Sequence, residues 1–374
     1  MTRTGLRLFV ALLVVMAGVA GGIAPGVATA ESTAQDAQCE FPATFEDAGG
    51  AEVTLAEEPE EVVTLNPSAA QTMWEIGAEN KVTGVSQYAS YLDGAENRTA
   101  ISAEDGFTSV ETVIDLDPDL VLAPNTIPPE TVEQLRSEGD LTVYQFESAS
   151  SIDDVRDKTR LIGQLVGECE GAEETVSWMD EELSAVEDRI EGEQPAVYFE
   201  FFETTPGQNT FQNDVLTTAG GQNVAAEAGI DGWGQMSQEQ LVEQNPEWLV
   251  VTEGYPLPEG EGIESSTAME EDNIVNVTEE HIQQPAPRVV YAVSAINEAL
   301  YPETENGESA DDESTDEEST DDETADETNA DEESTDDETN DGGANDDEAT
   351  DPVPGFGIAA ALAALLTVVA LRRR

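Results

Sequence analysis

Positive charge is scarce in this sequence. Its 374 residues include 13 Lys and Arg and a single histidine, His281, against 82 Asp and Glu, which gives a formal net charge of -69. Proteins that bind nucleic acid neutralise phosphates with Lys and Arg, so this composition excludes nucleic acid as a partner. Sites for bare zinc or manganese favour several imidazole ligands, so we expect no metal site and no cofactor.

The motifs of common enzymes are missing as well. The chain has no Ser-His-Asp set with an elbow motif, no glycine-rich loop for a phosphate and no spaced cluster of metal ligands. Asp and Glu are too abundant for any pair of them to indicate acid–base chemistry. We therefore expect no enzymatic activity. A binding protein or a structural surface protein is expected instead.

Apolar residues are almost absent from residues 302–351, where 25 residues are Asp or Glu. Such a segment cannot offset the entropy of ordering, so we expect a disordered acidic stalk. Residues 352–374 follow, with a PGF tripeptide at 354–356, an apolar run at 358–371 and three arginines. This pattern resembles the archaeal PGF C-terminal sorting signal, which is exchanged for a lipid anchor. A permanent membrane span is the alternative.

The N-terminal end carries the features of a secretion signal. Residues 1–30 contain two arginines, an apolar run at 8–19 and an Ala-Thr-Ala cleavage site at 28–30. An N-terminal membrane anchor is the alternative, although the run is short for a span. We therefore expect the body on the extracellular face of the cell membrane, anchored through its C-terminus.

Export also bears on the modification sites. Cys39 and Cys169 are the two cysteines, and an even count in an exported chain favours one disulfide. The alternative for Cys39 is lipid attachment, but the apolar and small residues expected before it are missing. Asn97 and Asn276 each begin an Asn-x-Thr glycosylation acceptor.

The body is acidic even without its stalk. Residues 31–301 contain 57 Asp and Glu against eight Lys and Arg. A folded body of this charge repels itself at ordinary ionic strength, and concentrated salt screens that repulsion. The composition therefore indicates a halophilic source.

The body repeats part of itself at an offset of 128 residues. The segment SVETVIDLDPDLVL at 109–122 recurs as SQEQLVEQNPEWLV at 237–250. Each copy predicts a helix start, a short helix, a stop before proline and a buried strand.

A weaker echo precedes these segments. Strands predicted at 62–65 and 196–199 lead to helices that end at Gly77 and Gly220, where glycine can adopt a left-handed conformation. Strands that alternate with helices predict an α/β fold of two similar Rossmann-like lobes with mainly parallel sheets.

One long α-helix is expected to join the lobes. Residues 152–190 are mostly charged and lack proline, and apolar residues in the second half follow at spacings of four, three and four. Gly163, Gly167 and Gly171 weaken this prediction for the first half. A helical connector is stiff, so the lobes should move little against each other.

These features define an expected organisation in six parts. They are a signal peptide (1–30), an N-terminal α/β lobe (31–151), the interlobe helix (152–190), a C-terminal α/β lobe (191–301), the acidic stalk (302–351) and the sorting segment (352–374).

Two lobes, a bridging helix and export with tethering together resemble the helical-backbone (class III) solute-binding proteins. The similarity covers about residues 50–300, through VVTLNPSAAQTMWEIGAENKVTGVS, SVETVIDLDPDLVLAP, FQNDVLTTAGGQNVAAEAG, WGQMSQEQLVEQNPEWLVV and PAPRVV. That class delivers corrinoids, ferric siderophores and haem to ABC importers. The resemblance implies a substrate-binding protein with permease and ATPase subunits as partners, and we expect a monomer.

In that class a glutamate on top of each lobe meets arginines of the permease. The matching positions here are Glu111 and Glu239, which the repeat makes equivalent. Helix-start chemistry is the alternative for both residues. Thr108-x-x-Glu111 fits a capping box, and Glu239 in a first turn favours the helix dipole.

The ligand cleft is expected between the lobes, where loops after strand ends converge. Flat rings in these loops suit a large flat macrocycle, although each ring could equally belong to a core. The candidates are Tyr88, Tyr91 and Phe107 from the first lobe and Phe201, Phe202, Trp233 and His281 from the second. His281 is either an axial donor or hydrogen-bond partner of the ligand, or an ordinary surface or core residue.

The resemblance favours a corrinoid such as cobalamin over a ferric siderophore or haem. Relatives that bind cobalamin carry a tyrosine matching Tyr88 and a tryptophan matching Trp233, but a first-lobe tryptophan of theirs is Asp105 here. Anionic siderophore complexes often require an arginine-rich cleft, and only Arg288 and Arg98 are available. A surface structural or adhesion protein is a more distant alternative, which the duplicated α/β lobes disfavour.

Overall fold

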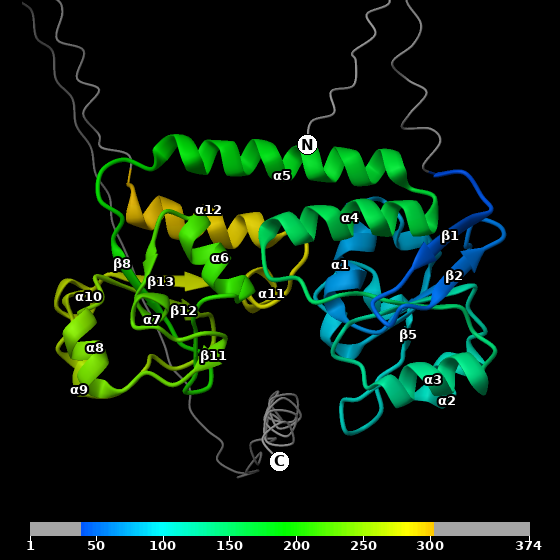
Figure 1. Cartoon of the computed structure of the whole chain (residues 1–374), viewed down its shortest axis with the longest axis horizontal. Coiled ribbons are helices and arrows are strands. Elements are labelled where there is room, and N and C mark those ends of the chain that lie inside the picture. The colour runs from blue at the N-terminus through cyan, green and yellow to red at the C-terminus, as the bar shows by residue number, and fades with distance from the viewer. Residues whose placement is uncertain (1–38, 303–374) are drawn as a thin grey trace, which may run out of the picture. The chain divides into compact units, whose positions relative to one another are not determined.

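A computed structural model describes residues 39–302 of the protein. Two α/β lobes lie next to each other, and a long helix, α5 (Cys169–Arg189), runs along both of them (Figure 1). The predicted signal peptide, sorting segment and nearly all of the acidic stalk lie outside the described residues. Within residues 39–302, no helix combines the length and apolar character needed to cross a membrane.

The first lobe is built on a five-stranded parallel sheet in the order β5-β4-β3-β6-β7. The strands are β3 (Val62–Thr64), β4 (Val82–Val85), β5 (Thr99–Ala100), β6 (Leu120–Ala123) and β7 (Val143–Gln145). Every residue of β3 and β6 is buried, as expected for central strands that helices cover on both faces. The helices are α1 (Pro67–Glu75), α2 (Val110–Asp115) and α3 (Pro129–Ser137), with short 3-10 turns η2 (Glu79–Lys81), η3 (Gln87–Ala89) and η4 (Ala95–Asn97). An antiparallel hairpin, β1 (Ala43–Glu46) and β2 (Glu52–Leu55), precedes them.

The second lobe repeats this plan with a four-stranded parallel sheet in the order β10-β8-β12-β13. Its strands are β8 (Ala196–Phe199), β10 (Gln222–Asn223), β12 (Trp248–Thr252) and β13 (Ile274–Val277), beside a small antiparallel pair, β9 (Thr205–Pro206) and β11 (Trp233–Gly234). Its helices are α6 (Phe211–Thr218), α7 (Val224–Glu227), α8 (Gln238–Gln244), α9 (Glu261–Glu264), α10 (Thr267–Glu271), α11 (Glu279–Ile282) and α12 (Val289–Leu300). The predicted α/β class with two mainly parallel lobes is confirmed.

The 128-residue repeat holds residue by residue. Ser109 and Ser237 are the N-caps of α2 and α8, and each side chain accepts a hydrogen bond from the backbone N–H three positions later. Asp117 and Asn245 follow these helices with φ values of 47° and 44°. Both residue types tolerate this left-handed conformation, which turns the chain into the next strand.

The expected single helix over residues 152–190 is in fact two helices. The first, α4 (Ile152–Val166), ends at Gly167, whose φ is 80°, and α5 then packs against it. A Cβ on Gly163 would lie 2.5 Å from the Cβ of Ala172, and one on Gly171 would lie 2.1 Å from the carbonyl oxygen of Ile76. The glycines therefore permit close helix packing. A long helix still joins the lobes, because α5 contacts α1 of the first lobe and α12 of the second.

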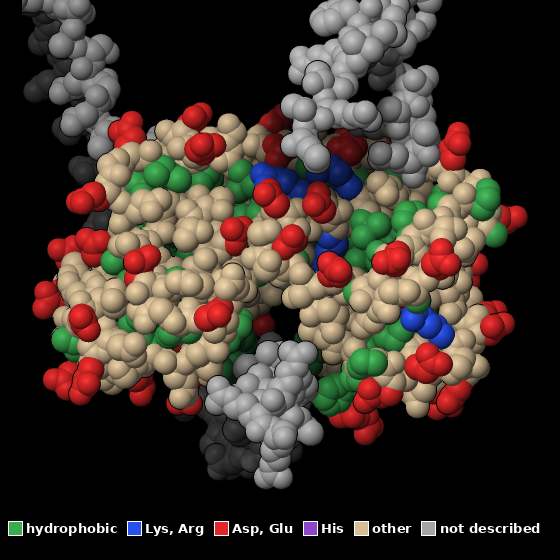
Figure 2. Space-filling view, in the orientation of Figure 1, with side chains coloured by type: hydrophobic (Ala, Val, Ile, Leu, Met, Phe, Trp, Pro, Cys, Tyr) green, Lys and Arg blue, Asp and Glu red, His purple; other side chains and the backbone are tan. Residues whose placement is uncertain are grey.

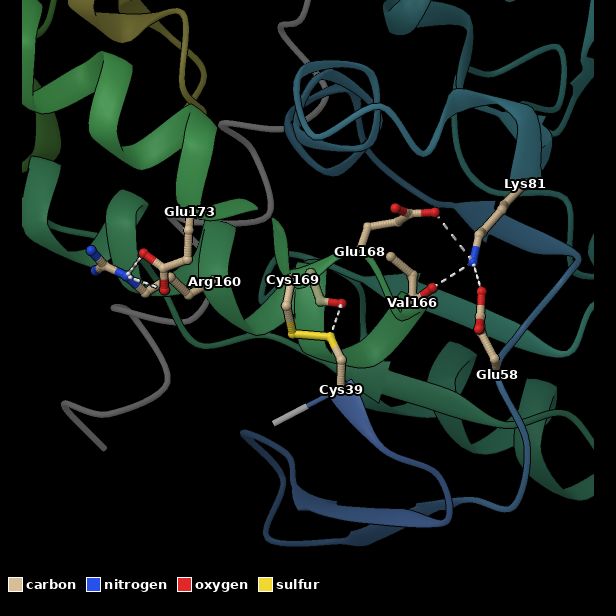
Figure 3. Close-up of a disulfide and its surroundings, with 9 residues drawn as sticks. Cys39, Glu58, Lys81, Arg160, Val166, Glu168, Cys169 and Glu173 are labelled. Carbon is tan, nitrogen blue, oxygen red and sulfur yellow. Dashed lines mark hydrogen bonds and ion pairs between the residues drawn. A yellow bond between two sulfur atoms is a disulfide. The ribbon is translucent and has the colours of Figure 1, made fainter. Parts of the chain in front are cut away.

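The start of α5 is tied to the N-terminal end of the described chain. Cys39 and Cys169 form the predicted disulfide (Figure 3). Beside it, the nearly buried Lys81 pairs with Glu58 and lies 3.7 Å from a Glu168 oxygen. These contacts fix the corner at which α4 turns into α5.

Candidate functional site

The carboxyl ends of the two parallel sheets face each other. Gln71 lies on α1, directly after β3, and its amide donates to the backbone oxygen of Glu280, just after β13, at 3.4 Å. Tyr91 follows β4, and its hydroxyl donates to Gln284 Oε1 of the other lobe at 2.6 Å. Loops at the carboxyl ends of parallel strands are where α/β proteins bind ligands. Figure 2 shows a hollow between the lobes with hydrophobic side chains on both walls.

The first lobe presents two of the predicted rings to solvent. Tyr88 lies on η3 and is 44 % exposed, and Phe107 lies in the loop before α2 and is 52 % exposed. Gly106 has a φ of 84°, and a Cβ there would lie 2.9 Å from the Tyr88 hydroxyl. The loop that carries Phe107 therefore packs against Tyr88, and the structure brings these two candidates together.

The second lobe presents an aromatic cluster after β8. Phe202 is 41 % exposed, and its ring centroid lies 4.5 Å from that of Phe201 and 5.5 Å from that of Tyr255. Sequence reasoning missed Tyr255, although its place just after β12 matched the rule used for the other candidates. Trp233 is half-buried on β11 and packs against the core of this lobe.

Tyr91 and His281 have neighbours that limit their roles. The Tyr91 hydroxyl also accepts a hydrogen bond from Gln71 at 2.9 Å, and burial raises the pKa of Tyr91 to about 12, so it stays protonated. Tyr91 thus joins the lobes through its hydroxyl. The half-buried His281 ring lies 5.2 Å from that of Tyr291, and burial lowers its pKa, so the imidazole is neutral at pH 7.

Polar contacts close the junction behind these rings. Gln71 is fully buried, and its carbonyl accepts the backbone N–H of Arg288 at 2.9 Å, while the Arg288 guanidinium donates to Glu75 at 2.7 Å. The Lys158 ammonium donates to Ser68 Oγ at 2.9 Å and to the Pro285 oxygen at 3.1 Å. Burial lowers the pKa of Lys158 to about 8.

Two pockets lie away from the predicted cleft, and none of the candidate aromatic rings lines either of them. A pocket of about 420 Å³ lies among α4, α5 and α6, and one of about 320 Å³ lies where α1 meets α5. No group of three or more His, Cys, Asp or Glu among the described residues could hold a metal ion. Asn97 and Asn276, the predicted glycan acceptors, are both exposed.

Glu111 and Glu239 are exposed and occupy equivalent positions on α2 and α8. Figure 1 places these helices on the two lobes, both on the side away from α5. The capping-box alternative for Glu111 is wrong, because Ser109 and not Thr108 caps α2. In α8, Ser237 and Gln240 form a capping box that does not involve Glu239. For Glu239, the remaining alternative is a favourable interaction with the helix dipole in the first turn. No hydrogen bond or ion pair within residues 39–302 occupies either carboxylate.

Comparisons with known proteins agree with this architecture. The profile of the periplasmic binding protein family matches residues 62–279, and that of the PGF-CTERM motif matches residues 353–374, which confirms the predicted sorting signal. The cobalamin-binding protein of Halobacterium salinarum is 41% identical over 284 residues, which cover 72% of this chain and 77% of that protein.

Two solved structures share the fold. The periplasmic haem-binding protein RhuT of Roseiflexus sp. RS-1, in apo form, aligns with a TM-score of 0.57 and 25% identity over 65% of this chain and 98% of its own. The periplasmic vitamin B12 binding protein BtuF of Vibrio cholerae aligns with a TM-score of 0.55 and 21% identity over 65% of this chain and 96% of its own. The two-lobed architecture, the family profile and the haloarchaeal relative together show that this chain belongs to the periplasmic binding protein family.

Proposed function

We propose that this protein is the extracellular substrate-binding component of an ABC importer, and that it captures a corrinoid such as cobalamin between its lobes. The observation that carries the proposal is the pair of aromatic walls at the facing carboxyl ends of the sheets. Tyr88 and Phe107 form one wall, and Phe202 and Trp233 belong to the other. Large exposed rings on opposite walls suit a bulky ligand with broad apolar faces.

The charges near the cleft favour a corrinoid over an anionic iron complex. Arg288 is paired with Glu75, and Arg98 lies just before β5, at the end of the sheet away from the carboxyl ends of the strands, where it donates to the Glu79 backbone and lies over Trp74. The 41% identical relative is named for cobalamin binding, which supports the same choice. Haem or a ferric siderophore is the second candidate, because haem binding is named for RhuT and because the neutral His281 could donate to iron.

The same proposal assigns roles to the surface and to the ends of the chain. Glu111 and Glu239 dock on the permease, one from each lobe, and the ATPase subunits complete the importer. The signal peptide directs export, and the C-terminal segment holds the protein at the membrane as a lipid or a peptide anchor. The protein acts as a monomer and not as an enzyme. A structural or adhesive role is the remote alternative.

A titration tests the proposal. The purified mature chain in molar KCl, which screens its charge, is titrated with cobalamin, haem and several ferric siderophores while tryptophan fluorescence is followed. We expect saturable quenching by cobalamin, and Tyr88→Ala should weaken it. Saturation by a siderophore or haem alone would replace the corrinoid. Binding of none of these ligands would refute capture of a macrocycle or an iron complex.

A further inference from the structure

The turn that carries Phe202 has an unusual backbone. Seven non-glycine residues within 39–302 have positive φ, and five of them are Asp or Asn, which tolerate that conformation. The two exceptions are neighbours, Phe202 with a φ of 50° and Glu203 with a φ of 58°. Neither has a short polar side chain that could stabilise the left-handed region. This turn is therefore strained for its sequence.

The hydrogen bonds around the turn hold it in this conformation. The Phe201 N–H donates to the Thr204 oxygen at 2.8 Å, and the Thr204 N–H returns a bond to the Phe201 oxygen at 3.1 Å. Two central residues with positive φ between such paired ends follow the type I′ pattern, which normally selects Asn and Gly. Glycine at either position would relieve the strain.

Burial of Phe202 does not explain why the strain is retained. The side chain stays 41 % exposed, while the neighbouring Phe201 is 8 % exposed and belongs to the core. Phe202 meets Phe201 at 71° and Tyr255 at 90°, so edge-to-face contacts hold one part of the ring and leave the remainder in solvent.

Tyr255 connects this cluster to the junction between the lobes. Its hydroxyl donates to Glu279 Oε2 at 3.1 Å, and burial with the nearby Glu279 carboxylate raises the pKa of Tyr255 to about 12. Glu279 begins α11, and the next residue, Glu280, accepts the bond from Gln71 of the first lobe. The aromatic cluster is therefore bonded to α11, the helix that contacts the first lobe through Glu280.

We infer that the strained turn at residues 201–204 presents the Phe202 ring to a flat apolar face of a macrocyclic ligand, and that Phe202 is the residue of this turn that contacts the ligand. Tyr255, held by Glu279, is the positioning residue that keeps the ring in place. Backbone strain that burial does not explain is typical of ligand clamps. This inference rests on the proposed function and adds a turn, a tyrosine and a glutamate to it.

Glycine substitutions separate the ring from the strain. Phe202→Gly relaxes the backbone and removes the aromatic ring. Glu203→Gly relaxes the same turn but keeps the Phe202 ring. In cobalamin titrations of the mature chain in molar KCl, we expect Phe202→Gly to weaken binding by about tenfold. Glu203→Gly should leave the affinity within about twofold and raise the thermal unfolding midpoint, because positive φ favours glycine.

The positioning role has its own readout. Tyr255→Phe keeps the ring and removes the bond to Glu279, so we expect faster cobalamin dissociation with an unchanged unfolding midpoint. Retained affinity and dissociation rate in Phe202→Gly, with wild-type binding intact, would overturn the inference and leave the proposed function standing. Failure of the wild type to bind cobalamin, haem or siderophores would refute both.

Discussion

At the scale of single residues, the buried carboxylate of Asp47 stabilises the fold through several hydrogen bonds and an ion pair. The Asp47 side chain is fully buried in the turn between β1 and β2. One carboxylate oxygen accepts the N–H groups of Gly49 and Ala51, both at 2.9 Å, and the other pairs with Arg136 of α3. Burial alone would raise the pKa of Asp47, but these hydrogen bonds and the guanidinium lower it below its usual value.

This lowered pKa predicts a specific loss of stability in acid. A carboxyl group with a lowered folded-state pKa stabilises the fold above its unfolded pKa of about 4, and that contribution is lost as the pH falls through the folded pKa. We therefore expect Asp47→Asn to reduce the unfolding midpoint at pH 7 and the difference from wild type to shrink below about pH 4. Thermal unfolding in molar KCl across pH measures this. A difference that stays constant with pH would contradict it.

For the candidate cleft residues, the sequence indicated their exposure after strand ends better than it indicated their hydrogen-bond partners. Tyr88, Phe107 and Phe202 follow strand ends and are exposed, as expected of candidates chosen by that rule. Tyr91 satisfied the same rule, yet its hydroxyl bonds Gln71 and Gln284. Gln71 lies on α1 of the same lobe, but Gln284 comes from the other lobe and lies nearby only after the lobes pack, so residue type and spacing could not reveal this second partner.

At the scale of elements, contacts with distant parts of the chain also explain why residues 152–190 form two helices, α4 and α5, where the sequence predicts one. Periodicity identified the apolar face of residues 152–190, but the glycines were interpreted as weak points in one helix. Gly167 ends α4, and Gly171 accommodates the backbone of Ile76, nearly a hundred positions earlier in the chain. The repeat, in contrast, was visible because an αβ unit encodes its cap, stop and strand locally.

The corner between these helices depends on the disulfide. The Cys39–Cys169 bond closes a loop across a sequence separation of 130 residues. A cross-link of that span restricts the unfolded chain strongly, and its loss should lower the free energy of unfolding by on the order of 3–5 kcal/mol. Urea unfolding in molar KCl, with and without a thiol reductant, measures the loss. A Cys39→Ser/Cys169→Ser variant is the control, since reductant should not change its midpoint. An equal effect of reductant on that variant would refute this assignment.

At the scale of the whole molecule, five of the eight Lys and Arg within residues 39–302 lie on α4, on α5 or at the start of α12, the helices that run along or between the lobes. Figure 2 shows acidic side chains scattered across the visible face, with Lys and Arg side chains near its middle and also on the first lobe. Several pairs join α4 and α5 to each other or to the lobes, namely Arg156–Asp180, Arg160–Glu173, Arg189–Glu298 and Lys81–Glu168. Lys158 and Arg288 add contacts of α4 and α12 with α1 and its N-terminus. Positive charge therefore offsets acidic repulsion where the lobes must stay together.

The acidic surface also raises the question of how a permease could recognise two glutamates among so many. Concentrated salt provides the answer, because at about 1 M the Debye length is about 3 Å and only direct contacts retain their attraction. Glu111 and Glu239 are separated by the repeat offset of 128 residues and are exposed at the same helical position on each lobe. In the proposed docking, position in the first turn of each helix together with equivalence between the lobes, rather than net charge, therefore distinguishes this pair from the surrounding carboxylates.

A matched pair of variants tests this docking surface. We expect Glu111→Gln/Glu239→Gln to reduce cobalamin uptake by the assembled importer at least about tenfold, since two charged hydrogen-bonded contacts are lost, while ligand affinity and unfolding midpoint stay unchanged. Asp115→Asn/Glu243→Gln is the control, because these exposed residues lie one turn later on the same two helices and change the net charge equally. Uptake from wild-type, docking and control proteins in molar KCl decides the matter. An equal loss in both variants would mean that the permease responds to overall acidity and not to these two positions.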